Sequence, residues 1–167
     1  MNAALLMVNS DTYGSSGGHV PVFSTAPTAF EIALHEMGHS HFGLADEYPF
    51  PDGATKEGPG QHRPAEPTEP NVTATLEPLK WQAYVTAGIS IPTTSNPDCS
   101  SYDSQPNPYA PQTVGAYEGA KYLRCGLYRP QYDCRMRTLG QPFCAICQQA
   151  IRRVFSPFMK RRAVGHR

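Results

Sequence analysis

The sequence predicts an α/β (α+β) fold, with a small mixed sheet, a helix in the first third of the chain and a second helix near the C-terminus. Three patterns support this prediction: a short apolar run over residues 3–8, and two stretches with helical spacing that follow Thr28 and Pro142. With 167 residues, the chain is long enough for one domain with its own core. We therefore expect a single domain over residues 1–155, followed by a basic, solvated tail over residues 156–167.

Two short strands are expected before the first helix. Residues 3–8 form a continuous apolar run, and its shortness favours a strand buried on both faces over a helix. Residues 20–22 form a second strand, which Pro21 marks as an edge because proline cannot donate a hydrogen bond to a neighbouring strand. An extended peptide could add to such an edge through main-chain hydrogen bonds, although an edge that proline merely protects is an equal alternative.

The first helix is expected to begin at Thr28, because Thr28-Ala29-Phe30-Glu31 matches a capping box. Gly43 is expected to end it, in the left-handed conformation that lets the chain reverse direction. The side on which this helix should pack is marked by four apolar residues at helical spacing: Phe30, Ala33, Leu34 and Met37.

The motif His35-Glu36-Met37-Gly38-His39 lies roughly opposite this apolar stripe. Residues four apart project from the same face of a helix, so His35 and His39 can bind one metal ion. Glu36 lies about 100° away and can reach a metal-bound water without being a ligand, as the general base of a zinc hydrolase does. Two unrelated surface histidines are disfavoured, since a chance match in a chain this long is a roughly half-per-cent event.

A catalytic zinc ion takes three protein ligands and keeps one open position. After the reversal at Gly43, Asp46 is the best placed acid to complete the set, and Glu47 is second. A zincin of the other type would use a glutamate from a second helix, but Glu57 and Glu66 lie among prolines and glycines. The sequence therefore favours one Zn²⁺ with Asp46 as third ligand and leaves Glu47 as the alternative.

The central part of the chain has little periodicity. Residues 49–78 are rich in proline and are expected to form a surface excursion or lid, and residues 90–116 are also irregular. A short helix is expected over residues 79–85, where Trp81 should be packed. The helix that follows Pro142 should pack on the core through an apolar stripe: Phe143, Ile146, Cys147, Ala150, Ile151, Val154 and Phe155.

The C-terminal part of the chain holds all five cysteines: Cys99, Cys125, Cys134, Cys144 and Cys147. We prefer disulfides, with one thiol left over, in a secreted or extracytoplasmic protein, although residues 1–8 lack the basic region and the length of a signal peptide. One bridge would tie Cys144 or Cys147 to the segment of Cys134. The alternative is a second, structural zinc ion held by the last four cysteines, whose spacing is not that of the usual zinc ribbon.

Charge and hydropathy limit the possible partners. Fourteen basic and fourteen acidic residues give no net charge, so neither nucleic acid nor an anionic membrane is expected as a partner. No apolar run approaches the roughly 18 residues of a membrane span. Basic residues do crowd the C-terminal end, where a solvated tail is preferred over a nucleic-acid contact: Arg152, Arg153, Lys160, Arg161, Arg162 and Arg167.

The run from His35 to Tyr48 resembles the IgA-peptidase family of zinc metallopeptidases, which are relatives of the metzincins. Later segments resemble the same family in the same order, and the resemblance covers residues 3–155. These segments are residues 117–122, 126–130, 134–137 and 142–147. The resemblance implies a metzincin-like zincin catalytic domain that hydrolyses a protein or peptide substrate.

The resemblance also implies roles for individual residues. His35, His39 and Asp46 would bind zinc, and Glu36 would be the general base. Met136 would supply a methionine turn beneath the metal, whereas without the resemblance it would be taken for an ordinary core methionine. Asp46 lies one residue further from His35 than the third ligand of ordinary metzincins, which fits the IgA-peptidase family.

Hydrolysis also needs a second electropositive partner for the oxyanion, and Tyr128, Arg129 and Tyr48 are the candidates. Family members usually carry further strands and a helix before the segment at residue 3, so we expect an N-terminally truncated domain with an exposed sheet edge and exposed apolar surface. Two other functions compete with peptidase activity. One is a catalytically incompetent remnant that binds zinc and peptide, and the other is a redox or zinc-ribbon protein centred on Cys144 and Cys147.

Overall fold

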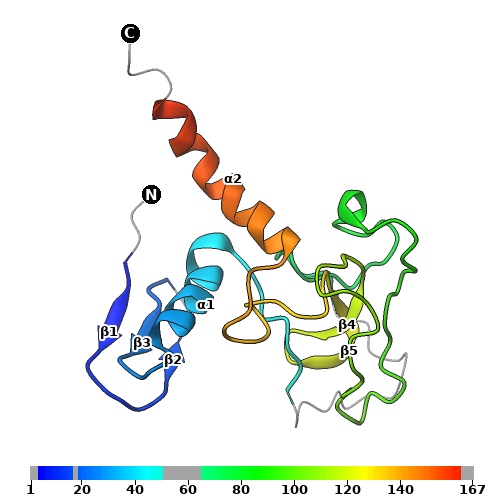
Figure 1. Ribbon diagram of the computed structural model, residues 1–167, viewed down its shortest axis with the longest axis horizontal. Helices are drawn as coiled ribbons and strands as arrows, with labels where there is room; N and C mark the ends of the chain where they lie inside the picture. The colour runs from blue at the N-terminus through cyan, green and yellow to red at the C-terminus, as the bar shows by residue number, and fades with distance from the viewer. Residues whose placement is uncertain (1–3, 17–18, 51–64, 163–167) are drawn as a thin grey trace.

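The computed structural model describes residues 4–16, 19–50 and 65–162 (Figure 1). It shows a small mixed α+β fold with two helices and two small sheets, in agreement with the predicted fold class. A three-stranded sheet lies beside the first helix, the two-stranded sheet lies among the long loops, and the second helix projects away from both (Figure 1). The elements in chain order are β1 (Leu6–Val8), β2 (Ser15–Ser16), β3 (Val22–Ser24), α1 (Ala29–Phe42), the 3-10 turn η1 (Gln82–Tyr84), β4 (Tyr117–Ala120), β5 (Leu123–Arg129) and α2 (Ala145–Arg162).

The first sheet has the order β1-β3-β2, with β1 parallel and β2 antiparallel to β3. The expectation of an edge strand at residues 20–22 is therefore wrong, because the strand begins at Val22 and is central. Pro21 precedes it, and its carbonyl accepts a hydrogen bond from Leu6 N at 2.9 Å. The expectation that the first strand is buried is also wrong, since Leu6 is 53% and Met7 61% exposed.

Helix α1 follows the predicted bounds but buries a different face. Among the described residues, the Thr28 side chain makes no capping hydrogen bond, so the predicted capping box is wrong. The predicted stripe is at best half-buried, and Phe30 is 71% exposed, whereas Ile32, Glu36 and Gly38 are buried. The described core thus lies on another side of α1, and the expected exposed apolar surface is present on β1 and α1.

Gly43 ends α1 as predicted. Its φ of 63° is left-handed, a conformation that costs glycine little because it has no Cβ. Gly43 N donates to the His39 carbonyl at 3.2 Å, and Leu44 N donates to the Gly38 carbonyl at 3.0 Å. These bonds turn the chain sharply, so that the residues after Leu44 run back along the helix end.

The second sheet is the antiparallel hairpin of β4 and β5. Lys121 and Tyr122 form its turn, and both have positive φ, at 45° and 69°, which suits the right-handed twist of a tight hairpin. This turn adds to the segment after α1, since Lys121 N donates to the Asp46 carbonyl at 3.0 Å and Tyr122 N to the Tyr48 carbonyl at 2.9 Å. The hairpin therefore supports the chain that follows Gly43.

The main core lies where the Leu44 segment, Trp81, Met136 and the start of α2 meet. Trp81 is buried as predicted, and its Nε1–H donates to the Gly115 carbonyl at 2.6 Å. The short helix predicted over residues 79–85 is the 3-10 turn η1, and residues 90–116 contain no helix or strand within the described structure, also as predicted. Of the predicted excursion over residues 49–78, residues 51–64 lie outside the described residues.

Helix α2 packs through its first turns and then leaves the core (Figure 1). Ile146, Cys147 and Ala150 are buried, but Phe155 is 44% exposed, so only the first half of the predicted stripe packs. The helix continues to Arg162, so the start of the predicted tail, residues 156–162, continues α2. Within the described residues, neither helix combines the length and apolar character that a membrane span requires.

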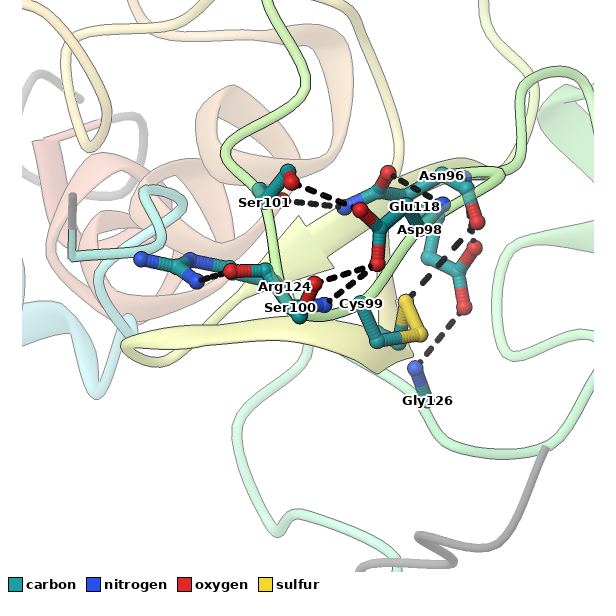
Figure 2. The surroundings of a disulfide bond; sticks show 9 residues. Asn96, Asp98, Cys99, Ser100, Ser101, Glu118, Arg124 and Gly126 are labelled. Atoms are coloured by element: carbon teal, nitrogen blue, oxygen red, sulfur yellow. Dashed lines mark hydrogen bonds between the residues drawn. A yellow bond between two sulfur atoms is a disulfide. The ribbon is translucent and has the colours of Figure 1, made fainter. Parts of the chain in front are cut away.

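One disulfide joins Cys99 to Cys125 on β5 (Figure 2). Beside it, the Glu118 carboxylate accepts hydrogen bonds from Asn96 N and Gly126 N, both at 2.8 Å, so the loop and the hairpin are also linked by a half-buried carboxylate (Figure 2). This disulfide is compatible with an extracellular protein. The predicted bridge from Cys134 to α2 is absent among the described residues, where three thiols remain instead of one: Cys134, Cys144 and Cys147.

Candidate functional site

Helix α1 and the reversal at Gly43 bring His35, His39 and Asp46 together. Asp46 Oδ1 lies 3.0 Å from His35 Nε2 and 3.2 Å from His39 Nε2, and the two nitrogens are 3.2 Å apart. Ligands of a tetrahedral zinc ion at about 2.0–2.1 Å are separated by roughly 3.3 Å. Two imidazoles and a carboxylate with these separations fit a zinc ion that keeps an open position.

The other ring nitrogens of both histidines are held by the main chain. His35 Nδ1 donates to the Arg135 carbonyl at 3.0 Å, and His39 Nδ1 donates to the Leu44 carbonyl at 2.8 Å. This tautomer leaves both Nε2 atoms free to bind a metal, and such carbonyl contacts are the usual outer support of histidine ligands. The sequence motif supplied the two histidines, but Arg135 was not expected to orient one of them.

Asp46 is buried and is held by a further contact at its second oxygen. The Tyr122 hydroxyl donates to Asp46 Oδ2, while Oδ1 faces the two histidines. Burial favours the neutral acid, but the hydrogen bonds that His35 and His39 donate when Nε2 is also protonated, together with that from Tyr122, outweigh it and hold the pKa of Asp46 well below its usual range. Asp46 is therefore an ionised carboxylate at neutral pH, as a metal ligand must be.

His39 responds in the opposite direction. Burial disfavours its charged form, but the hydrogen bond and charge of Asp46 outweigh this effect, so the pKa of His39 is raised. Protons therefore compete with a metal for this imidazole more strongly than for a free histidine.

Glu36 is buried and lines a pocket of about 190 Å³ together with His35 and Tyr48. The Tyr48 hydroxyl is half-buried; burial and then the charge of Asp46 raise its pKa to about 12, so it is a neutral hydroxyl donor. The pocket is large enough for a water molecule and a small part of a substrate next to the Glu36 carboxylate.

Met136 is fully buried beneath α1. A Cβ placed on Gly38 would lie 2.5 Å from Met136 Sδ, so the thioether packs directly against the helix between the two histidines. The Met136 carbonyl also accepts a hydrogen bond from Glu47 N at 2.7 Å. The turn that carries Met136 thus contacts both the helix with the two histidines and the segment that follows Asp46. His35, His39 and Asp46 are called the triad below.

Tyr128 and Arg129, two of the three candidates for stabilising an oxyanion, have other partners. The half-buried Tyr128 side chain packs against the main core, and burial, followed by the charge of Glu118, raises the pKa of its hydroxyl to about 12. Arg129 is buried, and its guanidinium donates to the carbonyls of Glu118 and Gly119 at 2.7 and 2.6 Å. Arg129 lines a separate pocket of about 440 Å³ whose lining contains none of the triad.

Tyr122 is a second residue of the site that was not predicted from the sequence. Its ring stacks on Phe50 with centroids 4.4 Å apart and meets Tyr48 edge-on at 5.5 Å, which fixes the hydroxyl toward Asp46. The only signal in the sequence was its position in the segment over residues 117–122 that resembles the family. Its contact with Asp46 spans 76 residues and has no local pattern.

Glu47, the alternative third ligand, is fully buried and lies in a different group of possible metal ligands from Asp46. Its carboxylate lies among three cysteines, and Asn71 Nδ2 donates to its Oε1 at 2.9 Å. Two adjacent acids therefore belong to two different clusters, and the geometry favours Asp46 over Glu47 for the histidine site.

The sequence of the chain matches the family model described as IgA Peptidase M64 over residues 1–107 and 104–155. No curated protein matches the chain. Because the family model covers far more than half of the sequence, the chain belongs to the IgA peptidase M64 family, and this membership supports a peptidase.

Proposed function

We propose that this chain is a zinc-dependent metalloendopeptidase in which His35, His39 and Asp46 bind one catalytic Zn²⁺. The observation that carries the proposal is the convergence of three donor atoms at separations of 3.0–3.2 Å, with Glu36 adjacent to His35. Three protein ligands leave one position open for water or substrate. Membership of a peptidase family supports peptide bonds in a protein or peptide as the substrate.

Glu36 is the proposed general base. When bound, the zinc ion would polarise the scissile carbonyl and acidify a water molecule. The Glu36 carboxylate would accept a proton from the attacking water and would later deliver it to the leaving amine. Its place in the wall of the pocket beside His35 supports this role, since the carboxylate faces the space that the reactants would occupy.

Tyr48 is a better candidate than Tyr128 or Arg129 for donating a hydrogen bond to the oxyanion. It lines the pocket that contains Glu36, and burial and then the charge of Asp46 raise its pKa to about 12, so its hydroxyl keeps its proton, whereas Arg129 already donates to main-chain carbonyls. The Tyr122 hydroxyl has a single proton, which it donates to Asp46 Oδ2.

Residues 1–155 are proposed to form a metzincin-like catalytic domain, with Met136 as the residue of a methionine turn. The packing of its thioether against Gly38 supports this interpretation, because it sets the height of α1 above the turn. The Cys99–Cys125 disulfide supports a secreted or extracytoplasmic location.

The test compares Glu36→Gln with the parent for zinc content and for cleavage of casein or a quenched peptide library. We expect the variant to keep one zinc ion at the triad and to lose at least about a hundredfold in cleavage rate. The exposed Glu77 provides a matched control, and Glu77→Gln should cleave like the parent. Cleavage by Glu36→Gln at the parental rate would show that the assigned base is wrong.

Removal of the metal tests the same proposal on the unmutated protein. A chelator should abolish cleavage, and added zinc should restore it. A parent protein that binds zinc at the triad but cleaves no peptide in the library would instead identify a catalytically incompetent protein that binds zinc and peptide.

A further inference from the structure

We propose that Glu47, Cys134, Cys144 and Cys147 form a second, structural metal site that holds a zinc ion. All four side chains are buried, and their donor atoms lie within 4.8 Å of one another. The inference does not depend on the proposed peptidase activity, because none of these residues belongs to the histidine site. It replaces the four-cysteine site considered from the sequence, since Cys125 is paired with Cys99 and Glu47 occupies the fourth position.

The distances fit tetrahedral coordination. With zinc–sulfur bonds of about 2.3 Å and zinc–oxygen bonds of about 2.0–2.2 Å, a tetrahedron separates two sulfurs by about 3.8 Å and a sulfur and an oxygen by about 3.5 Å. Cys134 Sγ and Cys147 Sγ are 3.7 Å apart. Glu47 Oε1 lies 3.7 Å from Cys144 Sγ and 3.3 Å from Cys147 Sγ.

The main chain around the sulfurs is arranged to stabilise thiolates. Cys144 N donates to Cys134 Sγ at 3.1 Å, and Cys147 N donates to Cys144 Sγ at 3.4 Å. Both residues lie at the N-terminal end of α2, where the helix dipole favours negative charge. Backbone donors to sulfur are the outer contacts that a metal-bound thiolate requires.

Glu47 supplies an independent observation that points to a ligand. Its Oε2 is buried and has no hydrogen-bond partner within the described part of the chain, while Oε1 accepts from Asn71. A buried carboxylate oxygen without a partner is costly, and a divalent cation beside it would remove that cost. A disulfide between Cys134 and Cys147 would remove two of the ligands, so that neither Glu47 nor Cys144 would have a bound cation beside it.

A metal ion here would join three segments that are distant in sequence. Glu47 directly follows Asp46, and Glu47 N donates to the Met136 carbonyl at 2.7 Å. The ion would therefore fix the segment that presents Asp46 to the histidines, the turn that carries Met136, and the first turn of α2. We expect its loss to weaken zinc binding at the histidine site by about tenfold or more.

The experiment loads the purified, unmutated protein with cobalt and counts ions and thiols. We expect two cobalt ions per chain and the thiolate-to-cobalt charge-transfer band, which histidine and carboxylate ligands do not produce. After unfolding in the presence of a chelator, three thiols should react. Cys147→Ser and Glu47→Gln should each lose or weaken the band, whereas His35→Ala combined with His39→Ala should keep it and lose one ion.

The matched control is Cys99→Ser combined with Cys125→Ser, which removes the disulfide and should leave the band unchanged. A parent protein without the band overturns the proposal, and so does one reactive thiol per chain, which would indicate a disulfide in the cluster. Both measurements use the parent, so a variant that fails to fold does not remove the test. A parent that shows the band but cleaves no peptide would refute the proposed peptidase activity and leave the structural metal site supported.

Discussion

Gly38→Ala tests whether the packing of α1 on Met136 sets the geometry of the metal site. The new Cβ would lie 2.5 Å from Met136 Sδ and 3.0 Å from Cε. Ordinary contacts between such atoms are about 3.5–4.0 Å, so the Met136 thioether and the helix must move apart by roughly 1 Å. Met136 is fully buried and has no solvent-exposed space into which its thioether could move.

The expected effect on stability is small, because two terms oppose each other. Alanine is favoured over glycine within a helix by about 1 kcal/mol, whereas overpacking a core costs about 1–3 kcal/mol. The net loss is then at most about 2 kcal/mol, or a decrease in Tm of no more than about 8 °C.

The expected effect on metal binding is larger. The turn with Met136 also provides the Arg135 carbonyl that orients His35, and it holds Glu47 N next to Asp46. A shift of roughly 1 Å between this turn and α1 changes ligand separations that are now 3.0–3.2 Å. We expect zinc affinity at the histidine site to fall by about 10–100-fold.

Competition with a chromophoric chelator measures the zinc affinity, and thermal unfolding measures the stability. Gly14→Ala is the control, because a Cβ there meets nothing within 4 Å. In a double-mutant cycle, Gly38→Ala should cost less in a Met136→Ala background, where the clashing atoms are gone. Parental zinc affinity and Tm in Gly38→Ala, or equal losses in both backgrounds, would refute the packing argument.

Two further predictions concern hydrogen bonds to carboxylates. Tyr122→Phe removes the donor to Asp46 Oδ2, so zinc affinity should fall about tenfold or more in chelator competition, and an unchanged affinity would exclude a role for this contact. Glu66 is exposed, and the desolvation that it does experience favours its neutral form, but hydrogen bonds from Lys80 and other donors outweigh this and lower its pKa from 4.5 to about 2. The stability from this depressed pKa is present above pH 4.5 and is lost as the pH falls through about 2; solvent screening limits it to about 1 kcal/mol. Glu66→Gln should therefore flatten the acid limb of the unfolding free energy measured by denaturant titration, and an unaltered limb would contradict the assignment.

The sequence indicated the features that depend on neighbouring residues. Helical periodicity placed His35 and His39 on one face, and a glycine after the last turn marked the left-handed end of α1. The same local geometry favoured Asp46 as the returning acid, since only a sharp reversal separates it from the helix, but it left Glu47 as the alternative. The short η1 turn and the irregular loops were also expected, because proline and glycine act through the local backbone.

Other features depend on contacts between distant segments. The buried side of α1 was predicted wrongly, because the Met136 turn packs on Gly38 rather than on the more apolar stripe that includes Phe30. Pro21 suggested an edge strand, but β1 and β2 pair on both sides of the strand that it precedes. Neither outcome follows from periodicity, since the pattern of one segment does not specify which segment will cover it.

The sequence by itself determined which side chains α1 presents together, because the spacing of His35, Glu36 and His39 and the reversal at Gly43 are fixed by the geometry of a single helix and its end. Only the tertiary structure decided which group each of the two adjacent acids joins. Asp46 lies with the two histidines, and Glu47 lies with the three cysteines at and before the start of α2. The physical reason is that Glu47 meets Cys147 across 100 residues, and such a contact depends on how the whole chain packs.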